Sequence, residues 1–224
     1  RRRGRSGAHV VGALADLDVA LEVGDGDVAV ADPGEHARLV PESYKAKVAE
    51  LAARFDLSPT LIEALVWQES RWRANAVSPV GARGLAQLMP GTARRVSKRL
   101  YGKPVKTRAL KRAKTNVAIG AALMRRLMNR FKDHSAPALA AYNAGHGAAT
   151  SWLRKRGHLP MDAWVETIPY DQTRRYVMRV SSMTRVYHHL YGVRGPLPAL
   201  RPNLPSTLGS FDRPEKGGQT PEET

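Results

Sequence analysis

The segment PTLIEALVWQES, residues 59–70, decides how this chain is interpreted. Its apolar residues Leu61, Ile62 and Leu65 recur at spacings of three and four, which predicts a helix with one buried face. Glu69 lies four residues after Leu65 and extends that face. Burial penalises the charged form of a carboxyl group and raises its pKa, so Glu69 is a candidate general acid. The alternative is a partly buried glutamate that only fixes the loop after it.

The loop after this helix has an uncommon composition. Residues 78–90 read SPVGARGLAQLMP, in which Gly81 and Gly84 allow close approach of the backbone. A short apolar turn follows the glycines, and Pro90 ends it. The segment therefore predicts a tight, specifically built loop directly after the helix that carries Glu69.

Helical periodicity recurs on both sides of this segment. Residues 44–55 form one predicted helix, and Ser58 followed by Pro59 is typical of the start of the next. Thr115 is expected to cap a helix with an apolar stripe over residues 117–131, and a stripe over residues 176–191 predicts a long final helix.

The fold class follows from these patterns. No convincing pair of strands occurs between the helical segments, so residues 41–192 are predicted to form one compact all-α domain. Residues 1–40 are expected to be a poorly ordered arm, with a candidate hairpin around residues 19–31. The Pro- and Gly-rich residues 193–224 are expected to be a disordered tail.

Composition excludes several classes of protein. The 224 residues contain no cysteine, which excludes disulfide frameworks, thiol nucleophiles and zinc ribbons. No stretch approaches the roughly 18 apolar residues of a membrane-spanning helix. The seven histidines show no paired helical spacing with a carboxylate, so we expect neither a metal site nor a cofactor. The first residue is Arg1, so an export signal cannot be read and the location must follow from the substrate.

Positive charge is concentrated in the predicted domain. Residues 41–192 hold 27 basic and 9 acidic side chains, whereas residues 1–40 hold 5 and 7, and residues 193–224 hold 4 of each. No acidic residue occurs between Glu69 and Asp133. Such a surface favours a polyanionic partner, for which nucleic acid, an anionic membrane and a cell-wall polymer are all candidates. The alternative is a solvated basic face with no partner.

Four separated motifs identify a family that this chain resembles. They occur in the order Glu69-Ser70 with Ser78, then Gly84-Leu85-Ala86-Gln87 leading to Met89-Pro90, then Ala141-Tyr142-Asn143, and finally Glu166-Thr167-Ile168-Pro169. In this order the chain resembles the soluble lytic transglycosylases, which have a goose-lysozyme-like fold and cut peptidoglycan. The resemblance covers about residues 42–192.

The resemblance implies roles for particular residues. Glu69 matches the catalytic acid and base of the family. The positions that line the cleft around the cleaved bond are matched by Ser78, Gln87, Met89, Tyr142, Asn143 and Glu166. The family cleaves between N-acetylmuramic acid and N-acetylglucosamine and forms a 1,6-anhydro end without water. By the same resemblance Glu166 orders the cleft and is not a nucleophile. An aromatic residue in a small helical domain more often belongs to the core than contacts a sugar, and of the four tryptophans Trp72, which follows the acid closely, is the best candidate for the cleft.

Two other functions remain open at this point. A true lysozyme would differ only in admitting water, and a basic module could bind peptidoglycan or nucleic acid without turnover. Nucleic acid is disfavoured because no recognisable binding motif for it is present. The expected partners are peptidoglycan strands and an envelope or secretion complex, in the bacterial periplasm or cell envelope.

Overall fold

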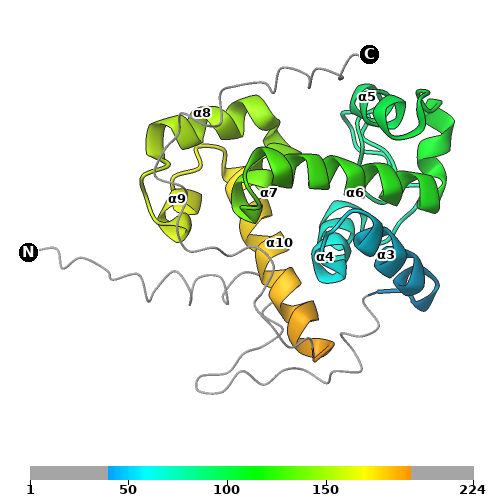
Figure 1. The fold of residues 1–224 in the computed structure, drawn as a ribbon, viewed down its shortest axis with the longest axis horizontal. Helices are drawn as coiled ribbons and strands as arrows, with labels where there is room; N and C mark the ends of the chain where they lie inside the picture. Colours follow the sequence, from blue (N-terminus) through cyan, green and yellow to red (C-terminus); the bar gives the residue numbers. More distant parts are fainter. Residues whose placement is uncertain (1–39, 193–224) are drawn as a thin grey trace, which may run out of the picture.

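The computed structural model describes residues 40–192, whose regular secondary structure is mainly helical (Figure 1). In chain order the elements are α3 (Glu42–Arg54), α4 (Pro59–Ser70), α5 (Pro90–Tyr101), the short 3-10 helix η1 (Thr107–Lys111), α6 (Ala113–Arg130), α7 (Ser135–Ala144), α8 (His146–Arg156), α9 (Met161–Glu166) and α10 (Asp171–Leu190). Extended pairing within this range is limited to two isolated bridges in the loop before α5. The prediction of an all-α domain is confirmed. The arm, its hairpin and the tail lie outside the described residues.

Helix α4 lies in the interior of the domain. It packs against α3 on one side and α10 on another, and residues 60–66 are all buried. Its start agrees with the prediction, since Ser58 is the N-cap and Pro59 the first helical residue. The prediction that α4 buries a single face is wrong, because neighbouring helices enclose it on more than one side. Burial therefore extends to Glu63, whose side chain is 3% exposed.

Helix α6 connects the two halves of the fold. It packs against α3, α5 and η1 at one side and against α7 at the other, and it crosses the middle of Figure 1. The expected cap at Thr115 is wrong, since the helix begins at Ala113 with Arg112 as N-cap. Ala113 and Lys114 are good helix formers, so the first turn extends past the residue with the better capping side chain.

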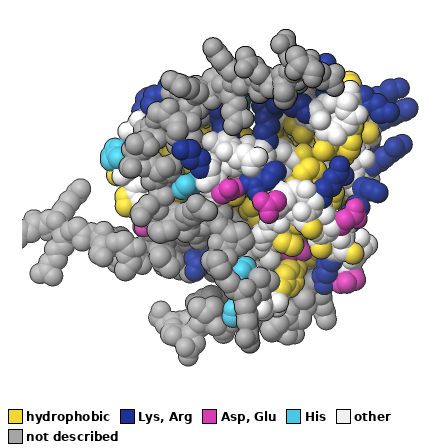
Figure 2. Space-filling view, viewed as in Figure 1, with side chains coloured by type: hydrophobic (Ala, Val, Ile, Leu, Met, Phe, Trp, Pro, Cys, Tyr) yellow, Lys and Arg dark blue, Asp and Glu magenta, His cyan; other side chains and the backbone are white. Residues whose placement is uncertain are grey.

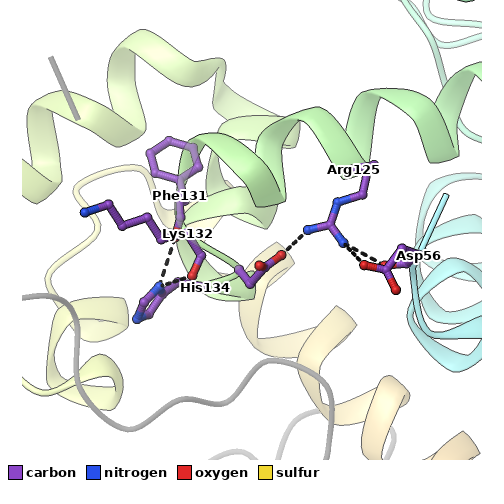
Figure 3. A network of polar contacts seen from close by, with 6 residues as sticks. Asp56, Arg125, Phe131, Lys132 and His134 are labelled. Carbon is purple, nitrogen blue, oxygen red and sulfur yellow. Dashed lines mark hydrogen bonds and ion pairs between the residues drawn. The ribbon is translucent and has the colours of Figure 1, made fainter. Parts of the chain in front are cut away.

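A polar network fastens one end of α6 to the corner between α3 and α4 (Figure 3). Arg125 donates to the backbone carbonyl of Asp56 at 2.6 Å and forms an ion pair with the Asp56 carboxylate at 3.3 Å. Arg125 also pairs with Asp133, which follows α6. Asp133 is therefore engaged in a structural ion pair.

Candidate active site

Glu69 is the penultimate residue of α4, and its side chain is half-buried. The hydroxyl of Tyr176 on α10 donates a hydrogen bond of 2.7 Å to its Oε1. Burial raises the pKa of Glu69 from 4.5 to about 7, and the bond from Tyr176 opposes this shift. The direction of this shift is the one that the sequence predicts, and burial is its cause.

The chain turns sharply directly after Glu69. Arg71 and Trp72 have positive φ angles of 51° and 61°, and the Arg71 guanidinium lies 3.1 Å above the centre of the Trp67 ring. Non-glycine residues in this left-handed conformation cost free energy, so surrounding contacts must hold the turn. The turn ends α4 at Ser70 and leaves the Glu69 carboxyl at the end of the helix.

The loop before α5 is held by its own side chains. The Ser78 hydroxyl accepts a hydrogen bond from the Ala82 N–H at 3.0 Å. The Gln87 amide nitrogen donates to the carbonyls of Gly84, at 2.8 Å, and Ala76, at 3.3 Å. Gln87 itself has a positive φ of 43°. Ser78 and Gln87 thus belong to one compact loop whose shape depends on both.

Asn116 of α6 holds this loop in place through hydrogen bonds to its backbone. This residue is 1% exposed, and its Oδ1 accepts a bond of 2.7 Å from the Ala86 N–H. Its Nδ2 donates to the carbonyls of Arg83, at 2.8 Å, and Leu110, at 2.9 Å. Three hydrogen bonds, two of them buried, therefore join the loop, η1 and α6 through one buried side chain.

Tyr142 and Asn143 of α7 approach from the other side. The Tyr142 hydroxyl donates to the carbonyl of Ala86 at 2.9 Å, and the Asn143 Oδ1 accepts from the Thr173 hydroxyl at 2.8 Å. Burial and the nearby Glu69 charge raise the pKa of Tyr142 well above its ordinary value. Tyr142 and Asn143 thus connect the loop, α7 and α10 around Glu69.

Two predicted site residues are not joined to Glu69 by these hydrogen bonds. Met89 is the N-cap of α5 and is 45% exposed. Glu166 ends α9 and is exposed, and its side chain forms no hydrogen bond or ion pair with another described residue. The contacts bring together Glu69, Tyr142 and Asn143, and through Ala86 they reach the loop of Ser78 and Gln87. They do not link Glu166 to this group.

No second carboxyl group takes part in the Glu69 pKa shift within residues 40–192. Glu63, on the same helix, is the other buried carboxyl, and burial also raises its pKa to about 7. Its hydrogen-bond partner is Tyr191, and Lys45 lies near it. Glu63 therefore belongs to a separate contact between α3, α4 and the end of α10. The described residues also contain no cluster of three His, Asp or Glu side chains that could hold a metal ion.

A family model described as the transglycosylase SLT domain matches residues 47–165, which is more than half of the chain. The chain belongs to this family. It is 37% identical over 142 residues to the soluble lytic murein transglycosylase of Salmonella typhimurium, covering 61% of this chain and 22% of that protein. It is 33% identical over 113 residues to the transglycosylase of Enterobacteria phage PRD1, covering 50% and 38%.

Solved structures agree with the SLT assignment. The domain matches an inactive mutant of the lytic transglycosylase Slt from Pseudomonas aeruginosa with a TM-score of 0.67 and 36% identity, over 73% of this chain and 26% of that one. It matches the 70 kDa soluble lytic transglycosylase of Escherichia coli with a TM-score of 0.65 and 31% identity, over 70% and 25%. The predicted lysozyme-like fold is confirmed, and this chain spans about a quarter of those structures.

One expectation about this SLT domain is wrong. Trp72 is 8% exposed and stacks on Tyr44 of α3, with ring centres 5.4 Å apart. The sharp turn after Ser70 directs Trp72 into the core, where it joins α3 to α4. The position of Trp72 in the sequence, two residues after the end of α4, does not show that its side chain points into the core.

Tyr176, the hydrogen-bond partner of Glu69, was not among the site residues that the sequence predicted. It occurs in the apolar stripe of the last helix, 107 residues after Glu69, so spacing along the chain could not connect the two. One signal was present, because a buried tyrosine usually needs a hydrogen-bond partner for its hydroxyl.

None of the helices within residues 40–192 combines the length and the apolar character that crossing a membrane requires.

Proposed function

We propose that this chain is the catalytic domain of a peptidoglycan lytic transglycosylase in which Glu69 is the single acid and base. The observation that carries the proposal is the raised pKa of Glu69 beside Tyr176, with burial as its cause and no second carboxyl group involved. A pKa of about 7 leaves a large fraction of Glu69 protonated near neutral pH.

In the first step Glu69 donates its proton to the glycosidic oxygen between N-acetylmuramic acid and N-acetylglucosamine. The bond from the muramyl C1 to this oxygen breaks, and the N-acetylglucosamine leaves with a free hydroxyl. The acetamido group of the muramyl sugar stabilises C1, in place of the second carboxylate that most glycosidases use. The Tyr176 hydroxyl stabilises the Glu69 carboxylate that results.

In the second step Glu69 takes a proton from the C6 hydroxyl of the same muramyl sugar. The C6 oxygen bonds to C1 and forms the 1,6-anhydro ring, so Glu69 regains its proton and no water is consumed. Neighbouring polar groups suit the positioning of sugar. The Asn143 amide nitrogen makes no hydrogen bond to any described residue, and Met89 exposes an apolar side chain at the start of α5.

Digestion of peptidoglycan followed by mass spectrometry tests this function against a hydrolase. We expect muramyl ends that are lighter by one water than those from a lysozyme digest of the same material. Neither Asp133 nor Glu166 should acquire a covalent sugar, because Asp133 is paired with Arg125 and Glu166 has no contact with the group around Glu69. Reducing muramyl ends would assign a lysozyme, and unchanged peptidoglycan would assign a binding module.

The proposed substrate supports a location in the bacterial periplasm or cell envelope, which is part of the proposal. Association with an envelope or secretion complex is a further part of the proposal, and the basic surface over α5 suits such contacts (Figure 2). Chemical cross-linking in cells, followed by identification of the captured proteins, tests this association.

A further inference from the structure

Five exposed basic side chains from three helices form a group that the proposed reaction does not use. We call it the arginine cluster: Arg95 and Arg99 on α5, Arg126 and Arg130 on α6, and His146 at the start of α8. Arg95 and Arg99 are four residues apart, as are Arg126 and Arg130, so each pair lies on one face of its helix. Helix α5 packs against α6, which brings the two pairs together.

The members of the cluster are close enough to repel one another. Burial lowers the pKa of Arg126, and Arg99, Arg130 and Arg95 lower it further. Burial likewise lowers the pKa of His146, with further lowering from Arg130, Arg126 and Arg95. Helices α5 and α6 therefore contribute the positive charge of one small region, His146 borders it as a neutral imidazole, and repulsion among the arginines disfavours the empty site.

No carboxylate within residues 40–192 compensates this charge. The one hydrogen bond of a cluster side chain to a described residue runs from Arg95 to the Thr92 hydroxyl, at 3.2 Å. Arg125, next to Arg126 in the sequence, shows the contrast, because it pairs with both Asp56 and Asp133. Arg125 is thus paired with carboxylates of the domain. The arginine cluster has no such partner among the described residues and is available to bind an anion.

Two of the helices that carry the cluster begin close in the chain to candidate contacts for sugar. His146 follows Asn143 by three residues, and α5 begins directly after Met89. The other candidate contacts near Glu69, namely Ser78, Gln87 and Tyr142, are uncharged and suit neutral sugar rings. Negative charge on peptidoglycan strands resides mainly on the carboxylates of their peptide stems, so a site for these carboxylates must lie outside that group.

We infer that the arginine cluster binds stem carboxylates and makes the domain select peptide-bearing strands over bare ones. This inference rests on the proposed function, because it takes the strand to lie beside Glu69. Guanidinium groups bind carboxylates with two parallel hydrogen bonds, which suits several carboxylates on one stem. The N-terminus of α8, which has no side-chain cap, adds favourable polarity for an anion.

Binding to three ligands tests the inference, in a Glu69→Gln background so that strands are held and not cut. The ligands are peptide-bearing glycan strands, the same strands after an amidase has removed the stems, and a teichoic acid without stems. The test variant changes Arg95, Arg99, Arg126 and Arg130 to glutamine. The matched control removes the same charge from the exposed residues Lys103, Lys106, Arg108 and Lys111.

The test variant is expected to bind peptide-bearing strands about tenfold more weakly, as four exposed charge contacts allow, and bare strands unchanged. The control should change either affinity by less than about twofold, and high salt should reduce the preference for stems. Thermal unfolding should show the test variant to be at least as stable as its parent, because the substitutions remove like-charge repulsion.

Three results would overturn the inference. Equal losses on bare and peptide-bearing strands would assign the cluster to sugars, and equal losses in both variants would assign a diffuse charge effect. Tight teichoic acid binding that the test variant alone loses would assign a phosphate polymer. The proposed function is read separately, from the anhydro ends that the protein with intact Glu69 releases, so either can fail alone.

Discussion

Glu69→Gln is expected to lower the rate of peptidoglycan cleavage by at least about 10², because the amide keeps the volume of the side chain and has no proton to exchange. The rate of release of soluble muropeptides measures this loss. Glu63→Gln is the matched control. Glu63 is a buried carboxyl on the same helix with the same raised pKa of about 7, but its partner is Tyr191. We expect the control to retain activity.

Stability separates loss of chemistry from loss of fold. Burial raises the pKa of Glu69 from 4.5 to about 7, so between these values the folded state binds more protons than the unfolded state. The free energy of unfolding of the parent protein therefore falls as pH rises from about 4.5 to 7, and Glu69→Gln lacks this contribution. The variant should gain stability relative to its parent across that window.

A loss of only a few-fold in the rate of peptidoglycan cleavage by Glu69→Gln would contradict the assignment of Glu69 as the acid.

Gly84→Ala is expected to destabilise the domain by about 3 kcal/mol, the sum of left-handed backbone strain and overpacking. Gly84 has a φ of +76°, and a Cβ there would lie 2.3 Å from both the Asn116 Nδ2 and the Leu110 carbonyl oxygen. Both atoms belong to the buried hydrogen bonds that hold the loop. Urea unfolding measures the change.

Gly81→Ala isolates the steric part of this effect. Gly81 lies in the same loop with a φ of +87°, but a Cβ there would have no atom within 4 Å. It should cost only the backbone strain, about 1 to 2 kcal/mol. If both variants lost the same stability, close packing between Gly84 and Asn116 would not be what fixes the loop.

Much of the fold could be predicted because its signals are local. The period of apolar residues located α3, α4 and α10, and the Ser58-Pro59 pair located the start of α4. The direction of the Glu69 pKa shift also followed from local spacing, since Leu65 on the preceding turn is buried. The two glycines of the loop were recognised as points of close approach, and Gly84 is one.

What the sequence could not reveal depends on contacts between distant segments. Tyr176 reaches Glu69 across 107 residues, and Asn116 bonds to Ala86 across 30. The direction of Trp72 depends on a turn of two left-handed residues, which no residue preference at those positions indicates. The charge run could be counted from the sequence, but its convergence into the arginine cluster required the packing of α5 on α6.

The central claim is that burial keeps Glu69 protonated as an acid near neutral pH. A carbon-13 NMR titration of the side-chain carboxyl groups tests it most directly, with the Glu69 and Glu63 signals assigned from the two glutamine variants. We predict that Glu69 titrates at about 7, and that Tyr176→Phe raises its pKa further by removing the hydrogen bond to the carboxylate. Titration of Glu69 near its ordinary value of 4.5 would contradict the account.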